Sequence, residues 1–258
     1  MRAIILAAGR GSRMGGLTCE QPKCLTPIAG RTLLDWQLAA LRAAGIRDIA
    51  LVRGYLAHCL QPADCTFFEN PRWAETNMVT TLTCADEWLK QHDCLISYSD
   101  IVYHPDIITQ LSANHSNLVI SYDQEWLSLW KERFADPLED AETFRLDAVG
   151  HLSDIGSRTD CLSDIEGQYM GLLKTTPVGW QCIRQYLEDF KDADRDRLDM
   201  TTLLQSLLSK GTEIQTTPIQ GRWCEVDNEI DLQVYKQLLA ENQPWSHDWH
   251  WKGSCSNA

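Results

Sequence analysis

The stretch that decides the fold is Met1-Arg-Ala-Ile-Ile-Leu-Ala-Ala-Gly9-Arg-Gly11-Ser-Arg13-Met-Gly-Gly16, followed at Gln21 by Pro-Lys23-Cys-Leu25. The apolar run from Ala3 to Leu6 predicts a buried strand. The four glycines after it let the backbone approach a ligand closely and turn successive N–H groups toward an anion. Arg13 and Lys23 add two positive charges to the same loop. The stretch therefore predicts a polyphosphate-binding loop at the end of the first strand.

Downstream of this loop, predicted helices alternate with predicted strands. The expected helices span 31–44, 76–90 and 105–113, and the expected strands span 48–52, 65–68, 94–98 and 118–122. This alternation predicts an α/β protein with a three-layer, Rossmann-like fold, in which helices cover both faces of a mostly parallel central sheet. Ligands of such sheets bind beyond the carboxyl ends of the strands, where the glycine loop and Asp100 both lie.

The second half of the chain is less regular. We expect an inserted lobe at about 123–175 that contains a hairpin over 144–155 and a further strand over 165–174. Helices are expected at 177–190, 200–209 and 229–239, and strands at 213–217 and 223–226. Residues 1–243 are therefore taken as one domain and 244–258 as a tail. His247 and His250 have a spacing that could touch a metal and three tail tryptophans could order part of it, but a disordered tail is the expectation.

Composition excludes several classes of protein. The chain has 258 residues and a net charge of -13, which argues against a general nucleic-acid binder. No apolar run reaches the roughly 20 residues of a membrane span. Ten cysteines occur without a Cys-x-x-Cys pair, so we expect free thiols in a reducing compartment and a cytoplasmic protein without a signal peptide.

The glycine loop also excludes two common nucleotide-binding motifs. It is not a P-loop, because no Gly-Lys-Ser/Thr follows. It departs from the dinucleotide fingerprint because its third glycine, Gly15, is misplaced, and the second strand ends in Val52-Arg53-Gly54 without an acidic residue. A Rossmann dehydrogenase is therefore not expected.

The runs Leu6–Met14 (LAAGRGSRM) and Gln21–Trp36 (QPKCLTPIAGRTLLDW) resemble the signature of nucleotidyltransferases that make nucleotide-activated sugars and alcohols. In that family a phosphate monoester attacks the α-phosphorus of a nucleoside triphosphate and pyrophosphate leaves. The resemblance extends over essentially the whole chain. It implies a nucleotide site in which Arg13 and Lys23 hold the triphosphate, and its expected residues are Leu6, Ala7, Ala8, Gly9, Gly11, Ser12, Arg13, Lys23, Asn77, Met78, Thr81 and Ser99.

Two aspartates are candidates for a metal site. Spacing alone leaves Asp100 open as a turn residue and Asp227 as a helix N-cap, although a carboxylate after a buried strand suits a hard cation. The run from Trp223 to Asp227 is similar to the closing aromatic–Glu–x–Asp motif of the family. The resemblance implies that Asp100 and Asp227 bracket Mg²⁺, with Glu225 in support. Because Arg13, Lys23 and both aspartates are present, an inactive relative is the less favoured alternative.

The base is expected to be cytosine. The stretch Asn70–Met78, with Thr76-Asn77 at a helix start, resembles the cytidylyltransferase branch typified by bacterial phosphocholine cytidylyltransferase. The plain alternative is that Thr76 or Asn77 only caps the helix. Both interpretations are compatible, and CTP is the predicted nucleotide.

The acceptor is predicted from a further resemblance. Motifs such as Gly167-Gln-Tyr-Met-Gly171 are similar to cytidylyltransferases of phosphoramidate and phosphonate biosynthesis, one of which acts on L-glutamine phosphate. We expect a small amine-bearing phosphate or phosphonate, with phosphocholine, 2-aminoethylphosphonate and sugar 1-phosphates as alternatives. A tryptophan cage could hold an ammonium group, although core packing explains the same tryptophans equally well. A homodimer and a role in capsule polysaccharide biosynthesis are further expectations. The candidate acceptor residues are Tyr122, Trp126, Trp130, Arg133, Asp136, Asp140, Glu166, Gln168 and Tyr169.

Overall fold

A seven-stranded sheet forms the centre of the protein, for which a computed structural model describes residues 1–241 and 244–252. Its order is β12-β8-β11-β6-β1-β4-β5. All neighbouring pairs are parallel except those of β11, which runs antiparallel to both β6 and β8. The predicted mostly parallel sheet is confirmed. The strands of this sheet are β1 (Arg2–Ala7), β4 (Ile49–Arg53), β5 (Cys65–Glu69), β6 (Cys94–Tyr98), β8 (Leu118–Asp123), β11 (Gln168–Thr175) and β12 (Gln215–Ile219).

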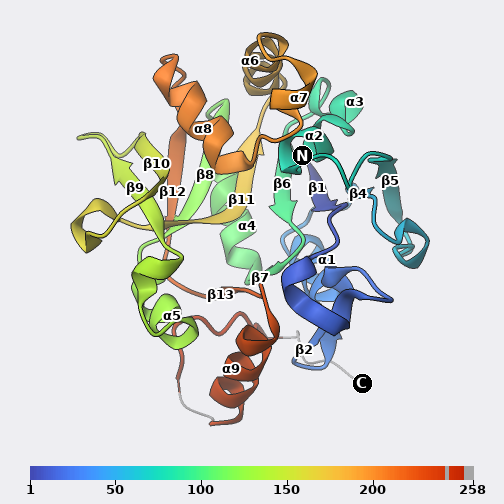
Figure 1. The fold of residues 1–258 in the computed structure, drawn as a ribbon, viewed down its shortest axis with the longest axis vertical. Helices are drawn as coiled ribbons and strands as arrows, with labels where there is room; N and C mark the ends of the chain where they lie inside the picture. Colours follow the sequence, from blue (N-terminus) through green and yellow to red (C-terminus); the bar gives the residue numbers. More distant parts are fainter. Residues whose placement is uncertain (242–243, 253–258) are drawn as a thin grey trace.

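Helices cover both faces of this sheet, as Figure 1 shows. Alternation along β1 sends Ala3 and Ile5 into one apolar cluster and Ile4 and Leu6 into the other. The first cluster is closed by α1, α4, α5 and α9, and the second by α2, α3, α6 and α8. The helices are α1 (Leu33–Ala43), α2 (Met78–Thr83), α3 (Asp86–Leu89), α4 (Pro105–Ala113), α5 (Trp126–Arg133), α6 (Pro177–Glu188), α7 (Asp192–Arg195), α8 (Met200–Ser209) and α9 (Glu229–Ala240).

Three small two-stranded sheets surround the centre. They pair β2 (Pro27–Ile28) with β3 (Arg31–Thr32), β7 (Ile101–Tyr103) with β13 (Trp223–Glu225), and β9 (Glu142–Leu146) with β10 (Leu152–Arg158). The last pair confirms the predicted hairpin. Short 3₁₀ helices lie at Ser12–Thr18, Lys23–Leu25, Ala57–Cys59, Pro137–Glu139 and Leu162–Asp164.

Two sequence expectations need correction. The single helix expected over 76–90 is divided into α2 and α3, because the hydroxyls of Thr81 and Thr83 bond to carbonyls of the preceding turn and compete with the helical ladder. The strand expected within the inserted lobe, β11, lies in the central sheet between β8 and β6. The extent of the lobe as a separate unit stays a prediction.

The tail expectation is wrong for residues 244–252. His247 and Trp249 are fully buried. The ring of Trp249 packs edge-on against Trp36 of α1 and Tyr235 of α9, with centroids 6.1 and 6.4 Å apart. Burial of such large rings offsets the entropy lost by ordering a short segment. The remainder of the predicted tail, 253–258, and residues 242–243 lie outside the described residues.

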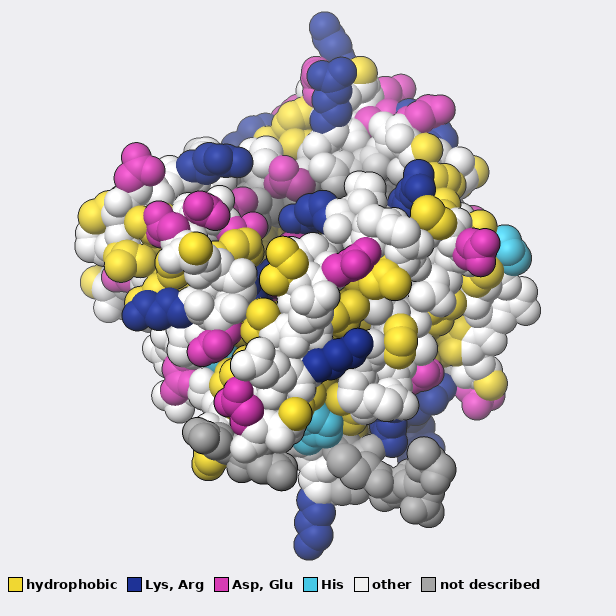
Figure 2. Space-filling model, turned by 60° about the horizontal axis from the view of Figure 1, so that its bottom comes forward, with side chains coloured by type: hydrophobic (Ala, Val, Ile, Leu, Met, Phe, Trp, Pro, Cys, Tyr) yellow, Lys and Arg dark blue, Asp and Glu magenta, His cyan; other side chains and the backbone are white. Residues whose placement is uncertain are grey.

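Three properties expected from the composition concern the charged surface, the cysteines and membrane spans. On the face in Figure 2, Lys and Arg side chains are scattered among Asp and Glu side chains. The nine cysteines within the described residues are free thiols. Among the same residues, no helix is both long and apolar enough to span a membrane.

Candidate active site

A pocket of about 300 Å³ opens at the carboxyl ends of β1 and β6. Every predicted nucleotide-binding residue except Ala7, which is buried within β1, lines it. Sequence reasoning did not select Trp73 and Tyr98, which also contribute to the wall. Trp73 lies within the stretch Asn70–Met78 that predicts the base site, and Tyr98 is the last residue of β6, two residues before Asp100. Both therefore lie beside motifs that the sequence does reveal. The full lining is Leu6, Ala8, Gly9, Gly11, Ser12, Arg13, Lys23, Trp73, Thr76, Asn77, Met78, Thr81, Tyr98, Ser99 and Asp100.

The loop between β1 and α1 places Lys23 in this pocket. Gly11 has a φ of 69°, in the left-handed region that favours glycine. A Cβ at Gly11 would lie 2.7 Å from the Cβ of Lys23, so the missing side chain leaves room for the lysine stem. Met14, fully buried, anchors the loop to the core. The glycine therefore has a specific packing role beside Lys23.

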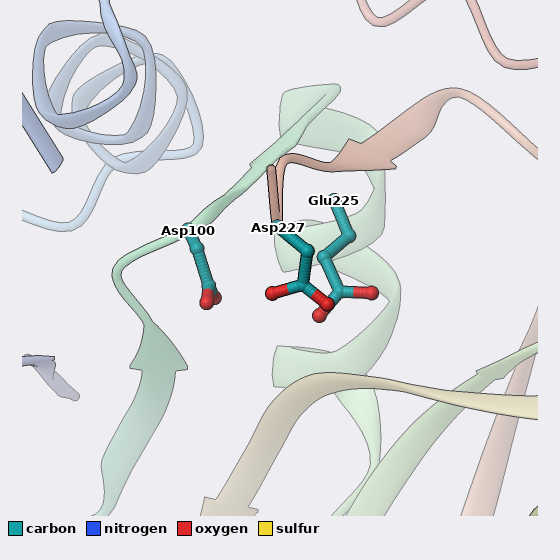
Figure 3. Close-up of side chains that lie close together, drawn as sticks. All are labelled: Asp100, Glu225 and Asp227. Atoms are coloured by element: carbon teal, nitrogen blue, oxygen red, sulfur yellow. The ribbon is translucent and has the colours of Figure 1, made fainter. Parts of the chain in front are cut away.

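The pairing of β7 with β13 brings the two candidate metal ligands together. Ile101 lies opposite Glu225 in this antiparallel pair, and the Val226 N–H donates to the Asp100 carbonyl at 2.9 Å. The carboxylates of Asp100, Glu225 and Asp227 extend into one space, as Figure 3 shows. One oxygen from each lies within 4.8 Å of the others. The three-residue strand β7 was not predicted, and it is the element that assembles this group.

Three cations neutralise these carboxylates. The Lys23 ammonium donates to Asp100 Oδ2 at 2.8 Å and to Asp227 Oδ1 at 2.9 Å. Arg13 reaches Asp227 Oδ2 at 3.0 Å from a largely exposed position. The fully buried side chain of Arg133 lies 3.1 Å from Glu225 and 3.7 Å from Asp227. Asp227 is thus surrounded by positive charge from three separate elements.

Burial and charge shift the pKa values here in opposite directions. Burial alone raises the pKa of Asp227, but Lys23, then Arg13 and Arg133, hold it below its usual range. Burial, reinforced by the charge of Asp227, raises the pKa of Glu225 despite the Arg133 contact. For Lys23, burial disfavours the charged form, yet the two aspartates raise its pKa overall. Lys23 and Asp227 therefore form a fully charged pair.

The carboxylate group fits a divalent cation. Asp100 Oδ1 is buried and has no hydrogen-bond partner. Carboxylate oxygens are the ligands that Mg²⁺ prefers. The donor set of Asp100, Asp227 and Glu225 therefore suits Mg²⁺ by its chemistry.

The wall predicted to read the base is held by polar contacts. The buried amide of Asn70 donates to Thr76 Oγ1 and Thr81 Oγ1, each at 3.0 Å. Asn77 caps α2, because its Oδ1 accepts from Met78 N at 2.8 Å. The capping alternative is thus correct for Asn77, and its presence in the pocket wall leaves a base-reading role compatible with it.

Four of the predicted acceptor residues, three aromatic and one basic, are engaged by other side chains of the protein. Trp126 and Trp130 are buried and pack edge to face, with centroids 5.9 Å apart. Tyr122 stacks on Phe144 at 4.8 Å. Arg133 is committed to the carboxylate group, and its Nε also pairs with Asp231 at 3.1 Å. The geometry favours core packing over an ammonium cage for these tryptophans.

The polar acceptor candidates divide into two sets. Asp136 and Glu166 accept from the backbone N–H groups of Leu138 and Leu146, and the Gln168 amide donates to the Glu142 carbonyl. Asp140 and Tyr169 are instead linked to residues of the site, Asp140 by charge and Tyr169 by a ring contact. Burial raises the pKa of Asp140, with the charges of Arg133, Asp227 and Arg13 all acting on it. The Tyr169 ring lies edge-on to Tyr98 of the pocket wall, with centroids 5.8 Å apart.

Comparison with known families identifies the fold and the chemistry class. The model of the MobA-like NTP transferase domain matches residues 3–158, which is more than half of the chain. The CTP:phosphoglutamine cytidylyltransferase of Campylobacter jejuni is 38% identical over 253 residues, covering 91% of this chain and 98% of that protein. The choline-phosphate cytidylyltransferase of Haemophilus influenzae is 34% identical over 136 residues, covering 50% of this chain and 58% of that protein. The resemblance inferred from the motifs is confirmed.

Solved structures agree on the fold. The inositol-1-phosphate CTP transferase of T. maritima superposes with a TM-score of 0.70 at 17% identity, covering 92% of this chain and 95% of that one. The CTP:phosphocholine cytidylyltransferase of Streptococcus pneumoniae gives 0.68 at 18% identity, covering 92% and 98%. The predicted Rossmann-like nucleotidyltransferase fold is confirmed.

Proposed function

The chain belongs to the nucleotidyltransferase family of MobA-like NTP transferase domains, and on this premise we propose that it is a Mg²⁺-dependent cytidylyltransferase. It transfers CMP from CTP to a small amine-bearing phosphate or phosphonate and releases pyrophosphate. L-Glutamine phosphate is the first candidate acceptor, because the relative that matches nearly end to end is named for phosphoglutamine.

One observation carries the proposal. A single pocket brings the glycine loop and Lys23 to Asp100, and Lys23 joins Asp100 to Asp227 through one ammonium. A triphosphate requires several N–H donors and fixed cations at one place, and a metal requires clustered carboxylates. The glycine loop, the cation of Lys23 and the clustered carboxylates lie on one edge of the sheet, beyond the carboxyl ends of β1 and β6, which supports the proposal.

The work of the protein is positioning and charge stabilisation. An oxygen of the acceptor phosphate forms a bond to the α-phosphorus, and the bond from that phosphorus to the bridging oxygen breaks, so pyrophosphate leaves with the electron pair. The acceptor is already an anionic nucleophile, so little proton transfer is needed. Arg13 and Lys23 bring the two anions together and stabilise charge that accumulates on the leaving group. Bound Mg²⁺ would supply further neutralisation of the phosphate oxygens.

Asp140 is the residue that we propose for the acceptor side. It is the carboxylate from the predicted acceptor set that interacts electrostatically with Arg13 and Asp227. A carboxylate on which the charges of Arg13 and Asp227 act could pair with an amine on the acceptor. This feature favours an acceptor with an amino group over a hexose 1-phosphate. Phosphocholine and 2-aminoethylphosphonate stay as second candidates for the same reason.

The test is pyrophosphate release over a grid of substrates. CTP, UTP, dTTP and ATP are each combined with L-glutamine phosphate, phosphocholine, 2-aminoethylphosphonate and glucose 1-phosphate, with Mg²⁺ present. We expect the highest kcat/KM for CTP with L-glutamine phosphate, and Asp227→Asn as the control without signal. Turnover with another nucleotide but not with CTP would refute the choice of base, and a grid without any turnover would favour the inactive relative.

A further inference from the structure

The place between Asp100 and Asp227 is already taken by a cation of the chain. The Lys23 ammonium lies 2.8 Å from Asp100 Oδ2 and 2.9 Å from Asp227 Oδ1. These carboxylates belong to the only group of three or more metal-type ligands that lie within 4.8 Å of one another among the residues 1–241 and 244–252. A divalent ion would need ligand oxygens at about 2.1 Å, so it cannot share this place with an ammonium that bonds to the same two carboxylates.

Two further oxygens of the group also face cations. Asp227 Oδ2 faces Arg13 at 3.0 Å and Arg133 at 3.7 Å. Glu225 Oε2 faces Arg133 at 3.1 Å. Asp100 Oδ1 is the one buried oxygen of the three carboxylates without a partner. A divalent ion that arrives alone would therefore meet carboxylates whose charge is already compensated.

Lys23 has an alternative partner within reach of its own side chain. Its stem passes over Gly11, and both residues line the pocket together with Gly9, Ser12 and Arg13. A polyphosphate bound by this loop would present anionic oxygens to the ammonium. The four-carbon stem of lysine allows its point charge to exchange one anion for another. The ammonium keeps an anionic partner after the exchange, and a divalent ion would replace its charge beside the two carboxylates.

We propose that Lys23 is the resident cation of the metal site, and that a polyphosphate draws its ammonium away and thereby opens Asp100 and Asp227 to a divalent ion. The nucleotide-free protein then binds a divalent ion weakly. The second half, in which a nucleoside triphosphate is the displacing anion, rests on the proposed function. Metal and nucleotide consequently enter as coupled ligands, and neither site is complete alone.

The first half is tested with Mn²⁺ and nucleotide-free protein. Free Mn²⁺ is measured by electron paramagnetic resonance in titrations of the wild type, Lys23→Met and the matched control Lys131→Met, which removes an exposed lysine from α5. We expect Lys23→Met to bind one Mn²⁺ about tenfold or more tightly than the wild type, because the competing unit charge beside the two carboxylates is removed. The control should equal the wild type. Equal affinity of wild type and Lys23→Met would overturn the proposal.

Two further variants keep the test clear of folding defects. Lys23→Gln should show the same gain in Mn²⁺ affinity, and adding Asp100→Asn to Lys23→Met should abolish it. Mn²⁺ should raise the midpoint temperature of thermal unfolding of Lys23→Met, but should raise that of the wild type only a little, since only the variant has a free site. A gain that survives loss of Asp100 would place Mn²⁺ elsewhere and refute the inference.

The second half is tested without metal. Binding of a CTP analogue with a methylene group between the α- and β-phosphorus is measured by calorimetry in the presence of EDTA. We expect Lys23→Met to bind it about tenfold or more weakly than Lys131→Met. Equal binding would refute displacement by the triphosphate. If the substrate grid fails while Lys23→Met still gains Mn²⁺ affinity, the proposed function falls and the resident cation stands.

Discussion

Asp123 and Asp227 make an informative pair, because each is buried at the carboxyl end of a strand, Asp123 as the last residue of β8 and Asp227 two residues after β13. Asp123 accepts from Glu125 N, Gly221 N, Trp223 Nε1 and His247 Nε2, at distances from 2.7 to 3.0 Å. Asp227 is surrounded instead by Lys23, Arg13 and Arg133. Both carboxyl groups have lowered pKa values, since these partners outweigh the burial that would raise them.

The difference lies in what can be exchanged. Backbone amides, an indole and a histidine within the core cannot leave Asp123 without local unfolding. Lys23 and Arg13 lie on a loop and reach Asp227 through long side chains. Another cation can therefore replace them beside this carboxylate. We infer that a buried carboxylate with fixed donors locks the structure, whereas one with mobile cations can serve a ligand. Variants of Lys23 and Asp123 should separate these two roles.

The largest expected effect is on catalysis, from Lys23→Met. Loss of a preorganised charge on the reacting phosphates should lower kcat/KM by about 10² to 10³-fold. Pyrophosphate release with CTP and the best acceptor of the grid measures it, and circular dichroism checks the fold. Lys131→Met should keep full activity. Near-native turnover of Lys23→Met would remove Lys23 from the proposed mechanism.

On the structural side, Trp249→Ala should have the largest effect on stability. The buried ring fills the space between Trp36 and Tyr235, so its truncation should lower the free energy of unfolding by about 3 kcal/mol. Urea denaturation gives the value. The half-buried Trp251 of the same segment is the matched site, and Trp251→Ala should cost less. Equal small losses would mean that the segment does not contribute to the core.

Asp123→Asn should lower the free energy of unfolding less than Trp249→Ala does. The amide keeps an acceptor for the backbone donors but loses the charged acceptor of His247 and Trp223, which is worth about 2 kcal/mol. The same urea experiment measures it, while the kcat of the folded variant should stay close to the wild type. Asp64→Asn, at an exposed left-handed position that asparagine tolerates, is the neutral control. An Asp123→Asn variant that folds normally yet loses kcat would show that Asp123 serves catalysis, as is proposed for Asp227, and does not act only in the structure.

The smallest expected effect is the pH dependence of the difference in free energy of unfolding between the wild type and Asp123→Asn. The pKa of Asp123 is lowered in the folded protein relative to about 3.9 in the unfolded chain. The stability that it contributes is therefore complete above the unfolded value and is lost as the pH falls through the folded value. The gap in free energy of unfolding between wild type and Asp123→Asn should narrow as the medium is acidified. A gap that widens would contradict the lowered pKa.

The sequence predicts the nucleotide side of the site well, because its signals are local. A strand, a glycine loop and a lysine lie within 25 consecutive residues, and the resulting pocket gathers eleven of the twelve predicted residues, all but Ala7. Asp100 and Asp227 were also selected, since each follows an apolar strand in a recognisable motif. Their roles in binding remain predictions for the experiments above.

The parts of the fold and of the site that the sequence does not predict depend on contacts between distant segments. β7 has three residues and follows β6 after a two-residue turn, so no periodicity marks it as a separate strand. Arg133 was selected for an acceptor because its helix is rich in tryptophan, but its partners lie some 90 residues away in β13 and α9. The buried state of His247 and Trp249 likewise depends on α1, β8 and α9, which no local pattern in residues 244–252 can reveal.

The antiparallel pair of β7 and β13 has a consequence for synthesis of the protein. On the ribosome, amino-terminal segments emerge and fold first. A nascent chain that has been made only as far as β12 carries the complete glycine loop, Lys23 and Asp100, but its second aspartate does not yet exist. Such an intermediate can hold Lys23 against one carboxylate only. The enzyme therefore acquires its full charge arrangement when β13 docks, so catalytic competence reports that the chain has been completed through this strand.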